Sequence, residues 1–424
     1  MGDRSRAVVL VVDAQPDRPC RFCGAPVGDV FVDLGMSPLA NANIPLERAS
    51  SMEPFYPLCA LVCRRCFLVQ LSLGQRAEHI FDEHYAYFSS YSSTWLEHCR
   101  AYVAQMTERL ELDASSQVIE LASNDGYLLQ YFVERDIPVL GIEPTANTAQ
   151  VAIEKGIPTR VEFWGEATAR AVAADTPADL LLGNNVLAHV PDINDFVDGM
   201  RIGLKSGGTI TMEFPHLLRL IELNQWDTIY HEHFSYLSFA TATRMFQAHG
   251  LRLFDVEELT THGGSLRIYG CHAEDPRPIS DAARELLARE RAAGLEDVQT
   301  YSDFGARVVE DKRQILEFLI ELKRAGATIA AYGAAAKGNT LLNFCGVGRD
   351  FLDFTCDANP HKQQHLLPGT HIPILAPAAI RDRRPDVVLL MPWNIKHELM
   401  QELSYIREWG GRFAARAPDL RLFA

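Results

Sequence analysis

Short apolar runs alternate with amphipathic stretches along most of the chain, which is the pattern of strands and helices in an α/β protein. The runs predicted to be buried strands lie at residues 117–122, 139–143, 178–183 and 209–214. The first strand is followed by the polar turn 123–127 and by the spaced apolar residues of a helix. This order places the turn at the carboxyl edge of a parallel sheet, where such folds bind ligands.

The pattern changes after residue 240. Residues 241–248 predict a helix that ends at His249-Gly250, because glycine stops helices. Two strands, 251–260 and 265–271, then flank the turn 261–264, which contains glycine and has the length of a hairpin connection. We therefore expect the first sheet to close with an antiparallel hairpin.

A second set of α/β elements occupies the C-terminal part of the chain. It begins with a long amphipathic helix at 302–324, a strand at 328–332 and a turn of small residues at 333–339. The start of a helix at 340–344 and two more strands at 354–357 and 386–391 follow. Together these elements predict a second Rossmann-like sheet, which we expect to hold no second cofactor.

Composition limits the possible partners. At about 150 residues per domain, 424 residues suggest two or three domains, and 47% apolar with 22% charged residues is ordinary globular composition. A net charge of −15 argues against nucleic acid as a ligand. The apolar run 7–12 is shorter than a signal peptide core, and no run approaches a membrane span of ~20 residues, so we expect a cytoplasmic protein without a membrane partner.

Nine cysteines include two Cys-x-x-Cys pairs, Cys20 with Cys23 and Cys63 with Cys66. Each pair can direct two thiolates at one ion, so the four predict a closed, structural zinc site. Cys59 lies four residues before Cys63 and is a competing ligand. The alternative is that the pairs are buried free thiols or a redox pair.

The turn after the first strand is suited to a cofactor with adenosine but no phosphates. It is not Gly-x-Gly-x-x-Gly: its one glycine, Gly126, leaves little room for a pyrophosphate, and Glu120 would repel one. Glu143 ends the next strand, 23 residues after Glu120, and a carboxylate there can accept from both ribose hydroxyls. The alternative is an ordinary turn without a ligand.

The sequence Tyr230-His231-Glu232-His233 concentrates groups that transfer protons or stabilise charge. A catalytic metal is an alternative, but the helical His-Glu-x-x-His spacing is absent. In a strand, Tyr230 and His233 would face opposite sides, whereas one helical turn places residues three apart on one face. We therefore expect a helical turn, with His231 in a structural or exposed position.

Several motifs occur in a fixed order along the chain. They are the two Cys-x-x-Cys pairs and the sequences that begin at residues 120 (Glu-x-Ala-Ser-Asn-Asp-Gly-Tyr-Leu-Leu), 184 (Asn-Asn-Val-Leu-Ala-His-Val-Pro-Asp), 230 (Tyr-x-Glu-His-Phe), 262 (His-Gly-Gly-Ser-Leu-Arg) and 332 (Tyr-Gly-Ala-Ala-Ala-Lys-Gly-Asn). The order of elements resembles class I S-adenosylmethionine methyltransferases. The motifs resemble, over nearly the whole chain, the nucleotide-sugar C-methyltransferases, which methylate C-3 of 4-keto deoxysugars in antibiotic and cell-surface sugar pathways.

This resemblance implies an organisation and an activity. We expect a zinc-binding domain at residues 1–80, a class I methyltransferase domain at 81–275 and a Rossmann-like domain at 276–424. The implied cofactors are S-adenosylmethionine and structural zinc. The expected cofactor-binding residues are Glu120, Ala122, Asn124, Gly126, Tyr127, Glu143 and Asn185.

The resemblance also implies catalytic roles. A ketone acidifies the hydrogen on the neighbouring carbon, so C-methylation needs a base, and His233 is the candidate because a neutral imidazole accepts a proton at pH 7. Tyr230 is expected to donate a hydrogen bond to the enolate oxygen, Glu232 to orient a neighbouring group, and His189 to face them. The alternative for His233 is a histidine that only positions the sugar.

Two segments are candidates for binding the nucleotide-sugar substrate. Tyr85, Tyr87 and Ser90 belong to a segment whose aromatic faces can stack on a base and whose hydroxyls can bond phosphate. Lys337 and Asn339 belong to the small-residue turn, whose N–H groups can approach a diphosphate. Ordinary packing is the alternative for both. The nucleotide, the sugar, the choice of C-3 or C-5 and the oligomeric state stay open, with a monomer as one alternative.

Three other functions are weighed against this one. A nicotinamide-dependent sugar oxidoreductase or dehydratase would need Gly-x-Gly-x-x-Gly or Tyr-x-x-x-Lys, but Tyr332 and Lys337 are five apart. A non-catalytic zinc scaffold would leave the Tyr-x-Glu-His sequence without a purpose. An O-methyltransferase needs no acidifying ketone, and a new carbon–carbon bond in the product would exclude it.

Overall fold

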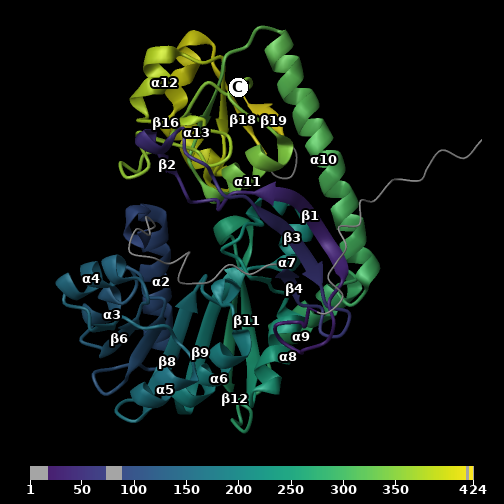
Figure 1. The fold of residues 1–424 in the computed structure, drawn as a ribbon. Coiled ribbons are helices and arrows are strands. Elements are labelled where there is room, and N and C mark those ends of the chain that lie inside the picture. Colours follow the sequence, from purple (N-terminus) through teal and green to yellow (C-terminus); the bar gives the residue numbers. More distant parts are fainter. Residues whose placement is uncertain (1–17, 73–87, 417–419, 424) are drawn as a thin grey trace, which may run out of the picture.

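The computed structural model describes residues 18–72, 88–416 and 420–423 (Figure 1). Its strands form three sheets. In Figure 1 the central sheet lies at the bottom, the C-terminal sheet at the top, and the N-terminal strands pass between them.

The central sheet has seven strands in the order β11-β12-β9-β8-β5-β6-β7. Their bounds are β5 (Val118–Leu121), β6 (Val139–Ile142), β7 (Thr159–Arg160), β8 (Ala178–Asn184), β9 (Leu204–Pro215), β11 (Leu251–Leu259) and β12 (Ser265–His272). The strands β5 to β9 run parallel, whereas β12 lies antiparallel between β9 and β11. The four expected buried strands and the closing hairpin are thus confirmed.

Helices cover both faces of the central sheet (Figure 1). Strand residues alternate between two apolar clusters: Leu181 belongs to one, and Leu180 and Leu182 to the other. The cluster of Leu181 includes residues of α5 (Glu166–Ala173), α6 (Ile193–Gly203), α8 (Phe239–Ala248) and α9 (Asp281–Ala292). The cluster of Leu180 includes residues of α2 (Ser93–Arg109), α3 (Gln130–Val133) and α4 (Ala146–Glu154). α7 (Leu217–Glu222) packs in the core shared with the C-terminal sheet.

The N-terminal sheet has four strands in the order β1-β3-β4-β10, all antiparallel. These are β1 (Asp29–Ser37), β3 (Tyr56–Val62), β4 (Val69–Leu71) and β10 (Ser235–Tyr236). Strand β10 directly follows the Tyr230–His233 segment. Its pairing with β4 therefore holds that segment against the N-terminal sheet.

The C-terminal sheet has eight strands in the order β19-β18-β17-β13-β14-β16-β15-β2. They are β2 (Ile44–Pro45), β13 (Ile329–Tyr332), β14 (Thr355–Cys356), β15 (His365–Leu366), β16 (Pro373–Leu375), β17 (Val387–Leu390), β18 (Arg412–Ala415) and β19 (Arg421–Phe423). Five adjacent strands, β18, β17, β13, β14 and β16, are parallel, which confirms the second Rossmann-like sheet. Its edge strand β2 comes from the N-terminal region of the chain.

Two helices of the C-terminal part, α10 (Val298–Arg324) and α11 (Ala336–Cys345), begin earlier than the sequence predicts. Two others, α12 (Ala378–Arg383) and α13 (Lys396–Glu402), were not predicted. The predicted turn 333–339 is too long, because α11 begins at Ala336 and takes Lys337 into its first turn. Gly333, with a φ of 93°, allows the sharp turn, and a Cβ there would lie 2.5 Å from Pro392.

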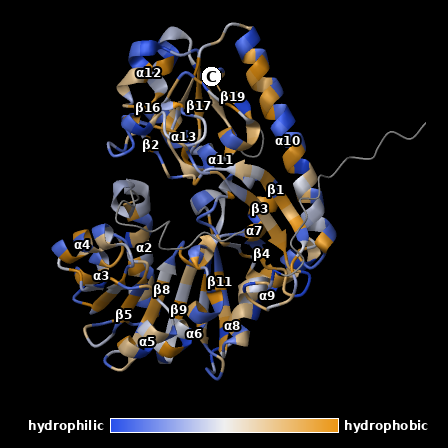
Figure 2. Cartoon of the chain, in the orientation of Figure 1, coloured by the Kyte–Doolittle hydropathy of each residue, from blue (hydrophilic) through white to orange (hydrophobic). Residues whose placement is uncertain are grey.

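Two features join the domains. The long helix α10 packs on β1, where Phe31 stacks on Phe304 with ring centroids 4.6 Å apart. Buried Arg416 donates to Asp227 at 2.8 Å and to Asp311 at 2.7 Å, so it links the C-terminal sheet to the segment before Tyr230. Figure 2 shows polar and apolar residues alternating along α10, as expected for a helix with one packed face. Among the described residues no helix is long and apolar enough to span a membrane.

Candidate active site

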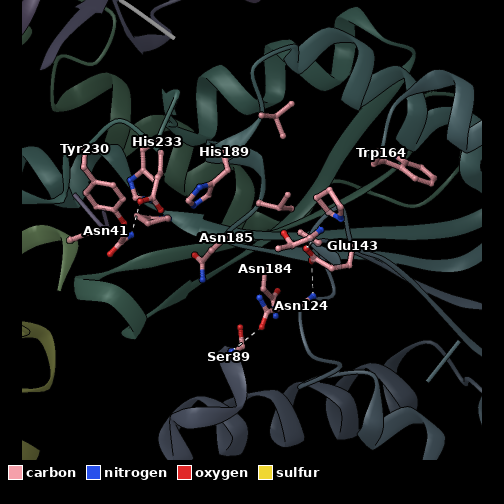
Figure 3. Close-up of a pocket in the computed structure, with 18 of the residues that line it drawn as sticks. Asn41, Ser89, Asn124, Glu143, Trp164, Asn184, Asn185, His189, Tyr230 and His233 are labelled. Atoms are coloured by element: carbon pink, nitrogen blue, oxygen red, sulfur yellow. Dashed lines mark hydrogen bonds between the residues drawn. The ribbon is translucent and has the colours of Figure 1, made fainter. Parts of the chain in front are cut away.

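A cavity of about 510 Å³ lies where the carboxyl ends of the two parallel sheets face each other. Ala122, Glu143 and Asn184 line it from the ends of β5, β6 and β8. From the C-terminal sheet, Lys337 follows β13 and Lys362 follows β14. Ligands of parallel α/β sheets bind at this edge, so the cavity is the candidate active site. Figure 3 shows part of its lining.

The loop after β5 has an unusual backbone. Ala122, Asn124 and Gly126 have φ values of 55°, 49° and 74°, so every second residue is left-handed. Only one of the three is glycine, although this conformation costs other residues roughly 1–2 kcal/mol. At Gly126 a Cβ would lie 2.3 Å from Ile157. The sequence alone does not reveal this strain, because it reads as a single-glycine turn.

The carboxylate of Glu143 holds this loop. It accepts hydrogen bonds from the backbone N–H of Asn124 at 2.9 Å and of Thr145 at 2.8 Å (Figure 3). Asn124 Oδ1 in turn accepts from the backbone N–H of Ser89 at 2.9 Å. Burial raises the pKa of Glu143, and the hydrogen bonds from Thr145 and Asn124 oppose that rise. Glu143 thus faces the cavity as an acceptor whose position is fixed by backbone contacts.

The lining suits a cofactor with both polar and aromatic parts. Asn184 Nδ2 and Asn185 Oδ1 are buried and have no hydrogen-bond partner among the described residues. Phe163 and Trp164, which follow β7, add aromatic surface to the same cavity. With the Glu143 carboxylate, these groups fit the amino acid, adenine and ribose parts of S-adenosylmethionine. Sequence reasoning missed Asn184, Phe163 and Trp164, although their place after strand ends was a usable signal.

Ten of the expected site residues line the cavity: Ala122, Asn124, Tyr127, Glu143, Asn185, His189, Tyr230, Glu232, His233 and Lys337. Four others do not. Glu120 is buried within β5, where burial raises its pKa well above the usual value, and Gly126 packs against Ile157. Ser90 accepts from Lys155 at 3.2 Å, and Asn339 is buried in α11. Tyr85 and Tyr87 lie outside the described residues.

The segment from Tyr230 to His233 forms a turn, in which the backbone N–H of His233 donates to the Tyr230 carbonyl at 3.0 Å. The expected pairing is present: the rings of Tyr230 and His233 have centroids 4.2 Å apart. The ring of His189 stands edge-on to His233 at 4.7 Å. His231 faces away from the cavity, with Nε2 3.3 Å from the Pro57 carbonyl. Three groups capable of proton transfer therefore meet at one point (Figure 3).

The hydrogen bonding of His233 determines which ring nitrogen is basic. Its Nδ1 lies 3.1 Å from the carbonyl of Thr228. Because a carbonyl only accepts, Nδ1 carries the hydrogen and Nε2 holds the lone pair. Burial lowers the pKa of His233 well below its usual value, and His189 adds to this. The ring is therefore neutral at pH 7, with Nε2 ready to accept a proton.

Glu232 brings a carboxylate to the same cavity. Its Oε1 accepts from the side-chain amide of Asn41 at 2.6 Å. Burial raises the pKa of Glu232 to about 7, while Asn41 and Lys362 act in the opposite direction. The carboxyl group is thus divided between its two charge states near neutral pH.

Two lysines of the C-terminal sheet make the far side of the cavity positive. The Lys337 ammonium lies 4.6 Å from the ring centroid of Trp393, and Lys362 donates to the Ala334 carbonyl at 2.9 Å. Burial lowers the pKa of Lys337 to about 8, with Asp227 opposing the shift. This end of the cavity is therefore suited to an anionic part of a ligand.

The four cysteines of the Cys-x-x-Cys pairs come together as predicted. The sulfur atoms of Cys20, Cys23, Cys63 and Cys66 all lie within 4.8 Å of one another, with Cys20 and Cys66 3.5 Å apart. Zn–S bonds of ~2.3 Å in a tetrahedron require sulfur atoms about 3.8 Å apart, so the cluster fits zinc. Cys59 is outside this group, so it is not the competing ligand that its spacing suggested.

The strand order of the central sheet is that of a class I methyltransferase, and the cavity lies at the sheet edge where such folds bind S-adenosylmethionine. Three family models match the chain: "Putative zinc binding domain" over residues 20–81, "Methyltransferase domain" over 95–256 and "C-methyltransferase C-terminal domain" over 260–418. The C-methyltransferase NovU of Streptomyces niveus is 34% identical over 411 residues, which are 97% of this chain and 98% of NovU. The chain therefore belongs to the C-methyltransferase family that includes NovU, and it is an S-adenosylmethionine-dependent C-methyltransferase with a zinc-binding domain.

Two solved structures align with less than half of this chain. The protein PH0226 of Pyrococcus horikoshii aligns with a TM-score of 0.35 and 12% identity over 44% of this chain and 95% of its own. Magnesium protoporphyrin IX methyltransferase of Synechocystis, with bound S-adenosylmethionine, aligns with a TM-score of 0.32 and 12% identity over 42% of this chain and 79% of its own. TM-scores this low support no conclusion about the site or the substrate.

Proposed function

We propose that this enzyme methylates C-3 of a nucleotide-linked 4-keto-6-deoxyhexose, with His233 as the base. The observation that carries the proposal is the position of His233: its Nδ1 is bound to a backbone carbonyl, which directs basicity to Nε2 beside Tyr230 and His189. Such a neutral imidazole at a cavity is suited to proton abstraction from carbon. The motif resemblance supports the ketone and the choice of C-3.

In this proposal His233 Nε2 takes the proton from the carbon beside the ketone, and the electron pair moves onto the ketone oxygen as an enolate. The lowered pKa of His233 makes it a weak base, so the enolate must be stabilised. The Tyr230 hydroxyl donates a hydrogen bond to that oxygen. Ionised Glu232 accepts from a hydroxyl of the sugar and so orients the ring.

The cofactor is assigned to the central sheet. Glu143 accepts from the ribose, while Asn124 and Asn185 bind polar groups of the amino acid part and Tyr127 packs beside them. When bound, S-adenosylmethionine would supply a methyl group on a positively charged sulfur: the methyl–sulfur bond would break as the new carbon–carbon bond forms, leaving a neutral thioether. The nucleotide diphosphate is assigned to the opposite side, where Lys337 and Lys362 provide positive charge.

The test is incubation with S-adenosylmethionine and freshly generated dTDP-4-keto-2,6-dideoxyhexose in deuterated water. Product mass and NMR report methylation, and exchange at the carbon beside the ketone reports deprotonation. A methyl group bonded to carbon at C-3 supports the proposal. A methyl group on oxygen or at C-5, or cofactor binding without either methylation or exchange, would contradict it.

Two variants test the base with a matched control. We expect His233→Gln to reduce solvent exchange and kcat by about 10²- to 10⁴-fold, the usual contribution of a general base, with little change in cofactor affinity. His231→Gln is the control, because His231 is directed at Pro57 and away from the cavity. Equal losses in the two variants would contradict the assignment to His233.

A further inference from the structure

One side chain at the cavity comes from the N-terminal zinc-binding region. Asn41 lies between β1, whose last residue is Ser37, and β2, whose first residue is Ile44. Strand β1 belongs to the N-terminal sheet, and β2 pairs with β15 of the C-terminal sheet through Ile44 and Leu366. The segment that carries Asn41 is therefore fastened at both ends, to two different sheets.

The conformation of this segment directs Asn41 at the active site. Ala40, directly before it, is buried, and the backbone N–H of Ala42 donates to the Leu39 carbonyl at 3.2 Å. The Asn41 side chain extends to Glu232, 191 residues later in the chain, and donates to its Oε1 at 2.6 Å. A tight turn with one buried anchor thus presents a single amide to the catalytic segment.

The ionised form of Glu232 depends on its hydrogen bond from Asn41. Glu232 is only 6% exposed, and the described residues supply its carboxylate with no other side-chain hydrogen bond. A buried carboxylate without a donor is strongly disfavoured in its ionised form. The other charged or titratable groups near it are Lys362, which follows β14, His189, which bonds the Glu232 backbone, and neighbouring His233.

We propose that Asn41 is a positioning residue for methyl transfer: its side-chain amide holds the Glu232 carboxylate ionised and turned toward the substrate. The inference rests on the proposed function, because Glu232 is the acceptor that orients the sugar there. Asn41 itself acts through Glu232 and does not transfer a proton. The zinc-binding domain then completes the active site directly, in addition to any part it has in folding.

The test compares Asn41→Ala and Asn41→Asp with the control Asn43→Ala. Asn43 lies in the same segment. Its contact with Asn41 is made by its backbone N–H, which donates to the Asn41 carbonyl and is kept in Asn43→Ala. We expect Asn41→Ala to lower kcat by about 10- to 100-fold, the effect of removing a hydrogen bond to a charged group, with zinc content and cofactor affinity unchanged. The acidic limb of the pH profile of kcat/KM should move to higher pH, and further in Asn41→Asp, where a second carboxylate faces Glu232.

A second measurement does not need the substrate. Infrared difference titration of the carboxyl C=O band, assigned with Glu232→Gln, should show Glu232 ionising at higher pH in both Asn41 variants than in the wild type or Asn43→Ala. An unchanged band and an unchanged pH limb would overturn the proposal, even if activity fell, because the loss would then be structural. If the wild type fails to methylate the chosen sugar, the proposed function fails, and the infrared result alone decides the role of Asn41.

Discussion

The pH dependence of kcat/KM should report Glu232 and not His233. Burial lowers the pKa of His233 well below its usual value, so we do not expect its protonation to produce the limb near pH 7. Glu232, with a pKa of about 7, changes from roughly one part in eleven ionised at pH 6 to roughly ten parts in eleven at pH 8. If the ionised form orients the sugar and charged Lys337 binds the diphosphate, kcat/KM rises about fivefold over this interval, because about half of Lys337 is neutral at pH 8.

The assay is a pH series of initial rates for the wild type and Glu232→Gln at constant ionic strength. Glutamine keeps the shape of the side chain but does not titrate, so its profile should be lower and should lack the rise near pH 7. The fall near pH 8, where Lys337 with its pKa of about 8 loses its proton, should remain in both enzymes. His233→Asn should be much slower but keep the limb near pH 7. If the rise of kcat/KM near pH 7 persists in Glu232→Gln, or is lost in His233→Asn alone, the assignment to Glu232 is refuted. The rise would then belong to the histidine.

Three more predictions concern stability and metal binding. Cys63→Ser should lose zinc and unfold the N-terminal domain, whereas Cys59→Ser should keep one equivalent of zinc, as measured by metal analysis. Arg416→Ala should lower the free energy of unfolding by about 3–5 kcal/mol in denaturant titration, because two buried aspartates lose their cationic partner and each keeps a tryptophan N–H as donor; exposed Arg412→Ala should change it little. Ala122→Gly should raise Tm slightly, by relieving roughly 1 kcal/mol of left-handed strain; a lower Tm would contradict that account.

Much of the fold could be predicted because parallel strands buried on both faces are continuous apolar runs. This property located β5, β6, β8 and β9 to within a few residues, apart from the earlier start of β9 at Leu204. The strands β2 and β10 were not predicted. Each has two residues, which is too short for any periodicity, and each exists only because a neighbouring sheet edge accepts it.

Part of the candidate site was predictable because it depends on a short spacing in the sequence. Tyr230 and His233 are three residues apart, so a local turn was enough to pair them. Asn41 and Lys362 were missed because their positions in sequence carry no signal for a contact with Glu232. The strain at Ala122 was missed because alanine gives no indication of a left-handed backbone.

The sequence by itself determined the kinds of elements, the zinc ligands and the members of the cluster that we propose to transfer protons, since these depend on short spacings and residue chemistry. The tertiary structure alone decided that the carboxyl ends of two Rossmann-like sheets share one cavity, and that a segment of the zinc-binding region reaches Glu232. The physical reason is that contacts between distant segments depend on strand order and on which edge accepts which strand. Those choices follow from the burial of whole sheets and not from any local pattern.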